Sequence, residues 1–393
     1  MKFRRLATIG ALGGIAALSI GAAHAQKATI VKIGHVAPLS GPNAEYGKDT
    51  ENGARMAVEE INKRGLVVGG EKVTLELDSQ DDAGDPKTAT QVAQKLVDDG
   101  VVAVVGHMNS GTSIPASKIY SDAGIVQVSP SATNPAYTLN GYKTAYRVVA
   151  TDAQQGPVLA EYAAKNLHAK TVAIVDDATA YGQGLADQFE SRVKSLGLTV
   201  LSHEKTTDKA VDFRAILTKI KSERPDVIMY GGMDATGGPF TKQARELAIK
   251  ARVLGGDGLC ADSLEKLAGE AAGNVVCSIA GGALERQPNG PDFAARFKQR
   301  FGQNVQVNAP FAYDAVYVIA DAMQRAKSPK AADILAAMPR TDYTGVLGRI
   351  RFDSRGDLKD GAISLYRYAN GKRTLIDQCT AGHPCGGDAG KAM

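Results

Sequence analysis

The sequence predicts an α/β fold of two doubly wound parallel-sheet lobes that are joined by a hinge with several chain crossings. Short β-branched apolar runs alternate with amphipathic helical patterns, which is typical of parallel βαβ units. This alternating series occurs twice, and 393 residues are enough for two to three domains. The segment after residue 275 is too poor in strands for a third such domain, so we expect it to complete the first lobe.

The first series covers residues 29–135. Residues 29–36 alternate and are β-branched, as in a strand, and a helix follows from about Tyr46 or Thr50 to residue 63. Asp85 is the expected N-cap of a helix over 87–99, which follows a strand over 73–80. The remaining elements are a buried strand over 101–105, a helix over 114–123 with Pro115 in its first turn, and a strand over 125–129.

The second series begins after Asp152. Its expected helices cover residues 153–166, 181–194, 213–222 and 239–247, and its strands cover 171–175, 199–205, 227–230 and 252–254. A strand near 275, helices over 291–301, 311–326 and 330–338, and strands near 347–352 and 363–368 follow. We therefore expect lobe 1 to comprise 27–150 and 281–352, lobe 2 to comprise 151–280 and 353–378, and a tail to cover 379–393.

Residues 1–25 have the pattern of a cleavable export signal. A basic start is followed by an apolar stretch over 6–23 and by Ala23-His24-Ala25, a small-x-small cleavage motif. The alternative is a membrane anchor, for which the apolar stretch is marginal in length. No cysteine precedes Cys260, so a lipid-attachment cysteine is not expected. We expect a soluble protein in the periplasm of a Gram-negative cell, or a secreted one.

The basic character of the chain lies mostly in this signal. Removal of residues 1–25 deletes Lys2, Arg4 and Arg5 and no acid, which lowers the formal charge from +4 to +1. Nucleic acid or an acidic membrane surface is therefore not an expected partner.

Four cysteines follow the signal, and an even number in an oxidising compartment favours disulfides. Proximity suggests the pairs Cys260–Cys277 and Cys379–Cys385. The competing interpretation is a metal site of Cys379, His383 and Cys385. Zinc ligands are usually spaced differently and a fourth ligand is not evident, so we expect no metal.

Two consecutive strands of the first series end in hydroxyl-rich loops, over 109–113 and 130–135. In open α/β sheets, ligands bind beyond the carboxyl ends of the strands, and both loops reach this edge. Hydroxyls and exposed backbone N–H groups suit a carboxylate ligand. The alternative is that serine and threonine are simply common in strand-to-helix loops. A hinge between two such lobes can close around a ligand.

Several short motifs, which follow one another in a fixed order along the chain, together indicate a resemblance to a known protein family. They are Ser40-Gly41-Pro42 with Tyr46-Gly47, Asp81-Asp82-Ala83-Gly84-Asp85-Pro86, Gly106-His107, Gln154-Gln155-Gly156-Pro157, Tyr181-Gly182-Gln183-Gly184, Tyr230-Gly231-Gly232 and Gly356-Asp357-Leu358-Lys359. Over about residues 29–368 the chain resembles the periplasmic branched-chain amino-acid (leucine/isoleucine/valine) binding proteins of ABC importers. These are type I periplasmic binding proteins, whose two lobes close like a Venus flytrap.

The resemblance implies a set of ligand-binding residues. Ser110 and Thr133, with backbone amides, correspond to the groups that hold the ligand's α-carboxylate. The loop over 131–133 and Asp257 correspond to the groups that hold its α-ammonium. The full set is Tyr46, Met108, Asn109, Ser110, Ser131, Ala132, Thr133, Tyr181, Met233 and Asp257.

This sequence departs from the family pattern at several of these positions. Asp257 stands where the leucine-type proteins typically have glutamate, Met233 where an aromatic residue is usual, and Ser131 where alanine is usual. Gly84 and Asn109 stand where the family has the two cysteines of a disulfide near the N-terminus, so that disulfide is absent from this chain. An amino-acid ligand is therefore expected, while the preferred side chain stays open.

The expected function is delivery of a small zwitterion to a permease in the inner membrane by a monomeric receptor without a cofactor. An enzyme is not expected, because there is no G-x-S-x-G elbow, phosphate loop, H-E-x-x-H or dinucleotide-binding glycine signature. His107 is expected to be structural. The alternative is a sensor or receptor module of the same fold for amides, aromatic acids or other small carboxylates.

Overall fold

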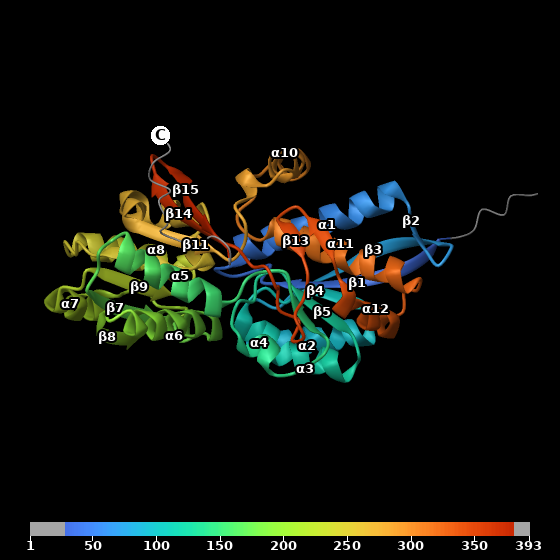
Figure 1. The fold of residues 1–393 in the computed structure, drawn as a ribbon, viewed down its shortest axis with the longest axis horizontal. Coiled ribbons are helices and arrows are strands. Elements are labelled where there is room, and N and C mark those ends of the chain that lie inside the picture. The colour runs from blue at the N-terminus through green and yellow to red at the C-terminus, as the bar shows by residue number, and fades with distance from the viewer. Residues whose placement is uncertain (1–27, 381–393) are drawn as a thin grey trace, which may run out of the picture.

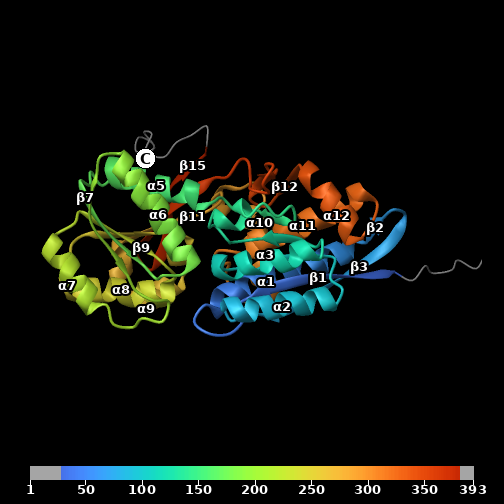
Figure 2. The same cartoon turned by 90° about the horizontal axis from the view of Figure 1, so that it is seen from below.

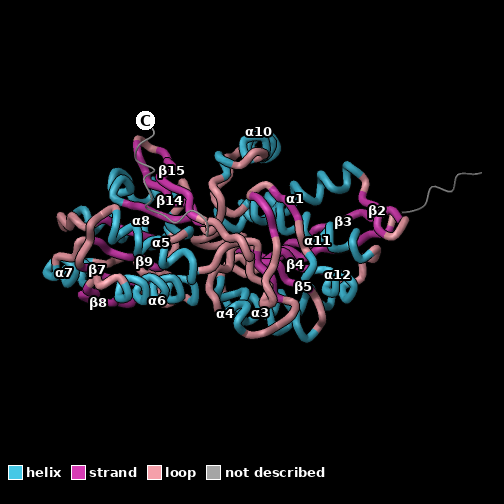
Figure 3. The backbone as a smooth tube through the Cα atoms, in the orientation of Figure 1, coloured by secondary structure: helices cyan, strands magenta, loops and turns pink. Residues whose placement is uncertain are grey.

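The computed structural model describes residues 28–380, which form two lobes side by side (Figure 1). Each lobe is built on one twisted sheet with helices on both faces (Figures 1 and 2). Loops gather at the waist where the lobes meet (Figure 3). The predicted two-lobe α/β architecture is confirmed.

The sheet of the first lobe has the strand order β2-β3-β1-β4-β5-β6. Its strands are β1 (Thr29–Ala37), β2 (Leu66–Val68), β3 (Glu71–Asp81), β4 (Ala103–Gly106), β5 (Val126–Ser129) and β6 (Ala145–Arg147). All neighbours pair in parallel except β2, which is antiparallel to β3. Ile33, Val105 and Val128 of the central strands are fully buried, as in a sheet covered on both faces.

The helices of this lobe come from both ends of the chain. They are α1 (Ala44–Arg64), α2 (Pro86–Asp98), α3 (Ser110–Asp122), α4 (Ala136–Leu139), α10 (Gly290–Phe301), α11 (Ala309–Ala326) and α12 (Ala331–Ala337), with the short helices η3 (Leu284–Arg286) and η4 (Met338–Arg340) and the hairpin β12 (Tyr343–Gly345) and β13 (Gly348–Ile350). Helix α11 packs along α1 (Figure 1). Its buried face is nearly continuous, so this late helix belongs to the core of the first lobe.

The sheet of the second lobe has the strand order β15-β14-β11-β10-β9-β7-β8. Its elements are α5 (Asp152–Lys165), β7 (Thr171–Asp176), α6 (Ala180–Ser195), β8 (Thr199–Lys205), α7 (Arg214–Glu223), β9 (Val227–Gly231), α8 (Asp234–Glu246), β10 (Arg252–Gly255), η1 (Asp257–Leu259), α9 (Ser263–Ala268), η2 (Gly269–Asn274), β11 (Val275–Ile279), β14 (Ile363–Ala369) and β15 (Lys372–Cys379). Strands β7 to β11 pair in parallel, whereas β14 and β15 are antiparallel.

Within residues 28–380 the chain passes between the two sheets three times: after β6, after β11 and before β14. These passages lie at the waist (Figure 3). Among the same residues, no helix combines the length and the apolar composition needed to cross a membrane.

Two helices begin earlier than the sequence predicts. Helix α3 starts at Ser110 and not at residue 114, and α8 starts at Asp234 and not at Pro239. Pro115 and Pro239 therefore lie inside their helices and do not mark the first turn. The small residues before each proline have weak helix propensity, but their turns are buried and packing overrides that propensity. The correction places Ser110 at a helix N-terminus.

Candidate ligand-binding site

A small cavity of about 20 Å³ lies between the lobes, beyond the carboxyl ends of β4 and β5 in one sheet and of β9 and β10 in the other. It is lined by Tyr46, Met108, Asn109, Ser110, Ser131, Tyr181, Met233, Asp257 and Asn308. The structure therefore brings together all of the predicted site residues except Ala132 and Thr133. These two are fully buried in the loop next to the cavity.

On the first-lobe side, hydroxyl groups connect the two predicted loops. Ser131 Oγ donates a hydrogen bond to the Met108 carbonyl at 2.7 Å, and Ser110 Oγ accepts one from the Asn134 N–H at 3.2 Å. Ser129 Oγ donates to the His107 carbonyl and accepts from the Ala132 N–H, both at 2.9 Å. The two loops are therefore joined by hydrogen bonds into one wall of hydroxyl and amide groups at the start of α3.

Arg147 supports this wall from below. Its side chain is fully buried, and one terminal nitrogen donates to the carbonyls of Ala132 and Asn134 at 2.6 and 3.1 Å. Its Nε pairs with Asp357 Oδ1 at 2.8 Å. The guanidinium nitrogens are all hydrogen-bonded to groups behind the loop. The groups of this wall that line the cavity are therefore neutral donors, and the buried cation does not reach the cavity.

On the second-lobe side, Asp257 presents a carboxylate to the cavity. Its Oδ1 accepts hydrogen bonds from Gln155 Nε2 at 2.8 Å and from the Tyr181 hydroxyl at 3.3 Å. Burial raises the pKa of Asp257, and these two hydrogen bonds oppose that rise. Gln155 and Tyr181 therefore hold the carboxylate in place and favour its charged form.

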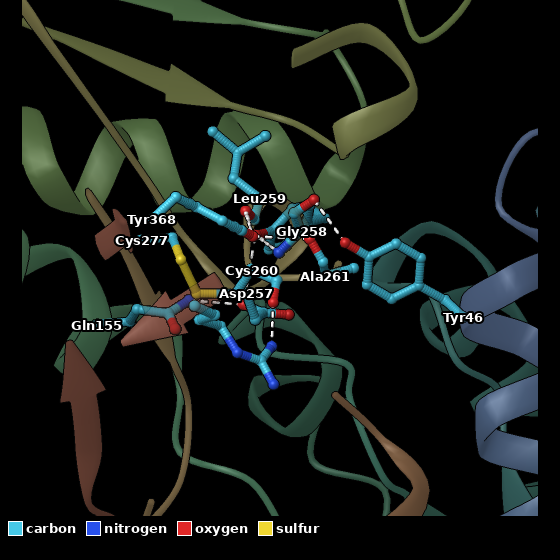
Figure 4. Close-up of a disulfide and its surroundings, with 11 residues drawn as sticks. Tyr46, Gln155, Asp257, Gly258, Leu259, Cys260, Ala261, Cys277 and Tyr368 are labelled. Carbon is cyan, nitrogen blue, oxygen red and sulfur yellow. Dashed lines mark hydrogen bonds between the residues drawn. A yellow bond between two sulfur atoms is a disulfide. The ribbon is translucent and has the colours of Figure 1, made fainter. Parts of the chain in front are cut away.

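Tyr46 and Tyr181 reach the backbone beside this carboxylate from different lobes. The Tyr46 hydroxyl on α1 donates to the Gly258 carbonyl at 2.8 Å, across the gap between the lobes (Figure 4). The Tyr181 hydroxyl accepts from the Gly258 N–H at 3.0 Å. A Cβ atom at Gly258 would lie 3.0 Å from the Tyr181 ring, and one at Gly256 would lie 2.6 Å from its hydroxyl. Glycine at both positions is therefore required for the Tyr181 contact.

Sequence reasoning missed two polar residues here. Asn308, the residue before α11, lines the cavity, and its position before Ala309-Pro310 is a recognisable helix start. Asp152 is fully buried at the start of α5, where its N–H donates to the Thr133 carbonyl at 2.9 Å. Burial, aided by the charge of Asp257, raises the pKa of Asp152 to about 8. Among the described residues, neither carboxylate oxygen of Asp152 has a hydrogen-bond partner.

His107 lies outside the cavity, in the core of the first lobe. It is fully buried, and its ring nitrogens lie 2.9 Å from Asp82 Oδ2 and 3.0 Å from the Tyr120 hydroxyl. With both nitrogens in hydrogen bonds, the ring has the structural role that the sequence predicts.

The disulfide predicted between Cys260 and Cys277 is present, with Cα atoms 5.5 Å apart (Figure 4). It ties the segment that carries Asp257 to β11. The other predicted pair, Cys379 with Cys385, and the competing metal site with His383 involve positions outside the described residues.

Within residues 28–380, one group of side chains has metal-ligating atoms within 4.8 Å of one another: Asp187, Glu190 and His203, on the outer side of the second lobe. The His203 ring already pairs with Asp176 at 2.8 Å and with Glu190 at 2.7 Å. The hydrogen bond with Asp176 is the main cause of the raised pKa of His203. This group is therefore an ion-pair cluster, and none of its three residues lines the cavity.

The chain matches known proteins over nearly its whole length. A family model described as periplasmic binding protein matches residues 30–372. The Leu/Ile/Val-binding protein BraC3 of Rhizobium johnstonii is 38% identical over 346 residues, which cover 87% of this chain and 92% of that protein. A leucine-, isoleucine-, valine-, threonine- and alanine-binding protein of Pseudomonas aeruginosa is 33% identical over 347 residues, 88% of this chain and 92% of that protein.

Solved structures agree with these relatives. The leucine-binding protein LivK of Thermotoga maritima superposes with a TM-score of 0.83 at 27% identity, covering 90% of this chain and 99% of that chain. LivJ of Streptococcus pneumoniae, in complex with isoleucine, gives 0.82 at 27% identity, covering 90% and 100%. The chain belongs to the type I periplasmic binding protein family, among the leucine/isoleucine/valine-binding proteins of ABC transporters.

Proposed function

We propose that this protein captures a branched-chain aliphatic amino acid between its lobes and delivers it to the permease of an ABC importer in the inner membrane. One observation carries the proposal: neutral hydroxyl and amide donors on one lobe face an oriented carboxylate, Asp257, on the other. A zwitterion complements these two walls, because its ends carry opposite charges. The relatives named above, which bind leucine, isoleucine and valine, support the same ligand class.

The ligand's carboxylate would lie against Ser110, at the N-terminus of α3, and against Thr133, in the loop after β5. Backbone N–H groups and the helix dipole both favour an anion there. The ammonium would lie at Asp257, and the carbonyls and hydroxyls of residues 131–133 would complete its hydrogen bonds. Tyr46, Met108, Asn109, Tyr181 and Met233 would surround the side chain.

Capture would proceed by closure of the two lobes about the waist, where the chain passes between them three times. The Tyr46–Gly258 hydrogen bond joins the lobes directly beside the carboxylate that holds the ammonium. Ligand binding and closure are therefore coupled at one place. An affinity on the order of micromolar, about −8 kcal/mol, is expected for such a site.

Four further features belong to the same proposal. Residues 1–25 are removed on export, and the mature protein works in the periplasm as a monomer. Its lobes comprise 28–150 with 281–352 and 151–280 with 353–379; the second lobe ends one residue later than predicted, because Cys379 pairs with Ile363 in the sheet.

Isothermal titration calorimetry on mature protein, unfolded and refolded to remove carried-over ligand, tests the proposal. Leucine, isoleucine and valine should bind, and Asp257→Ala should weaken their binding at least tenfold. Asp262→Ala, a nearby acid that does not line the cavity, is the matched control. Binding of acetamide or benzoate without binding of leucine would refute the proposal and favour the sensor alternative.

A further inference from the structure

Asp257 lies on a short turn that is rich in glycine. The segment Gly255-Gly256-Asp257-Gly258-Leu259-Cys260 covers the end of β10 and the helical turn η1. Glycine has more backbone freedom than any other residue, so such a segment loses much conformational entropy when it is ordered. If the ligand had to order the turn, that cost would lower its affinity. The contacts that hold the turn before a ligand arrives are therefore important for binding.

A disulfide closes this turn on the neighbouring strand. The Cys260 N–H donates to the Asp257 carbonyl at 3.0 Å, so Cys260 ends the turn that Asp257 begins. The side chain of Cys260 is bonded to Cys277 of β11, and both cysteines are fully buried (Figure 4). Cys277 is also the residue of β11 that lies in register with Gly255, the last residue of β10. Both ends of the turn are therefore attached at one residue of the sheet.

Two side chains of the hairpin β14–β15 hold the same turn. The Tyr368 hydroxyl lies within hydrogen-bond distance of two carbonyl oxygens, that of Leu259 at 2.8 Å and that of Ala261 at 2.7 Å (Figure 4). Arg373 donates to the carbonyl between them, that of Cys260. Three consecutive carbonyls are thus bound by side chains that follow them by more than 100 residues in the sequence.

The residues directly before these carbonyls make the contacts of the ligand site. Asp257 presents its carboxylate to the cavity, and the Gly258 carbonyl accepts the hydrogen bond from Tyr46 of the other lobe. None of the side chains that hold the turn lines the cavity. A change in one of them therefore affects a ligand only through the turn.

We propose that Cys260, Cys277 and Tyr368 are positioning residues for ligand binding. Together they fix the turn in the conformation that presents the Asp257 carboxylate, so the ligand's ammonium meets a preorganised partner. The hairpin β14–β15, which comes late in the chain, thereby takes part in the site. This role rests on the proposed function, in which Asp257 binds the ammonium.

A double-mutant cycle, measured by calorimetry with leucine on the refolded mature protein, tests the role of Tyr368. Tyr368→Phe removes the hydroxyl and keeps the ring. It should weaken leucine binding about three- to tenfold in the wild-type background and less than about twofold in the Asp257→Ala background, because it acts through that carboxylate. Tyr366→Phe, on the same strand but with its hydroxyl on Glu285, is the matched control and should bind leucine as the wild type does.

An equal loss in both backgrounds would show a merely structural role and overturn the inference. Wild-type affinity in Tyr368→Phe would also overturn it and leave the proposed function standing. No binding of leucine by the wild type would instead overturn the proposed function.

Hydrogen–deuterium exchange of the ligand-free protein measures the order of the turn directly. Tyr368→Phe and the double variant Cys260→Ala/Cys277→Ala should each speed exchange in residues 256–261 about fivefold or more, and leave exchange in β7 of the same sheet unchanged. If the double variant fails to fold, Tyr368→Phe decides alone. Unchanged exchange in residues 256–261 of a folded Tyr368→Phe protein would refute the positioning role.

Discussion

At the scale of single residues, the site depends on how side chains hold Asp257. A carboxylate one methylene shorter than the family's usual glutamate reaches less far, and two neighbours compensate by fixing its position. Gln155 and the Tyr181 hydroxyl both donate to the same oxygen. The other oxygen is left for a ligand. We therefore expect Asp257 to bind the ligand's ammonium because its carboxylate is held in place, although its side chain is shorter than that of glutamate.

Removal of the Tyr181 hydroxyl should reduce ligand affinity while the ring stays in place. We predict that Tyr181→Phe weakens leucine binding about three- to tenfold, because one hydrogen bond to Asp257 and one from the Gly258 N–H are lost. Calorimetry measures the change. Tyr162→Phe, on the outer part of α5, is the control and should match the wild type. A Tyr181→Phe protein with wild-type affinity would remove the hydroxyl from the site.

Asp152 should make the ligand-free protein less stable as the pH rises. Its pKa is about 8 in the folded state and about 3.8 when unfolded, so between these values the folded state binds more protons than the unfolded state. The unfolding free energy therefore falls as the pH rises through this window. We predict that Asp152→Asn is more stable than the wild type by about 1 kcal/mol or more at pH 8, and shows little gain at pH 4.

Urea unfolding of the ligand-free proteins at pH 4 and pH 8 measures this difference directly. Asp187→Asn, an exposed acid for which no such effect is expected, is the control. An Asp152→Asn gain that does not depend on pH would contradict the assignment. The sequence could not reveal Asp152, because an aspartate before a helix is an ordinary N-cap and its burial depends on the fold of both lobes.

At the scale of elements, helix α11 depends on an acid from another helix. Asp49 of α1 accepts hydrogen bonds from the backbone N–H groups of Gln306, Val307, Asn308 and Ala309, at 2.7 to 3.0 Å. These groups include the first N–H groups of α11, which no residue of the helix itself can satisfy. One buried carboxylate therefore sets the start of α11 and the position of Asn308 at the cavity.

We predict that Asp49→Ala destabilises the protein by about 3 kcal/mol or more, because buried N–H groups lose their acceptor. Urea unfolding gives the value. Asp122→Ala removes an exposed ion pair with Lys118 and should change stability by less than about 1 kcal/mol. A small effect at Asp49 would mean that water replaces the carboxylate.

Most elements were predictable from the sequence, because buried strands alternate with amphipathic helices when helices cover both faces of a parallel sheet. The exceptions have physical causes. The starts of α3 and α8 were placed too late, since a proline inside a helix resembles one in a first turn. Strands β2, β6, β12 and β15 were missed, because three-residue strands and an edge strand carry little pattern. The contact between Asp49 and α11 joins positions more than 250 residues apart, which local patterns do not report.

At the scale of the whole molecule, the cavity of about 20 Å³ is smaller than an amino acid, which fits the proposed mechanism in which the lobes part to admit a ligand. The resemblance to known binding proteins identified most of the residues that meet there, because they occur in recognisable motifs.

The hydrogen bond between Tyr46 and Gly258 should favour the closed arrangement. We predict that Tyr46→Phe increases the radius of gyration of the ligand-free protein, and that leucine at saturating concentration reverses the increase. Small-angle X-ray scattering measures both. Tyr142→Phe, on the outer surface of the first lobe, is the control. An unchanged radius of gyration in Tyr46→Phe would show that this bond does not hold the lobes together.

The three passages of the chain between the lobes have a mechanical consequence. One connecting segment would let a lobe rotate about any axis. Three connecting segments side by side favour rotation about one axis and resist rotation about the others. Each closure then brings the same two surfaces into the same alignment. In the proposed function, a membrane partner would therefore meet the same arrangement of the two lobes, whichever side chain the captured molecule carries.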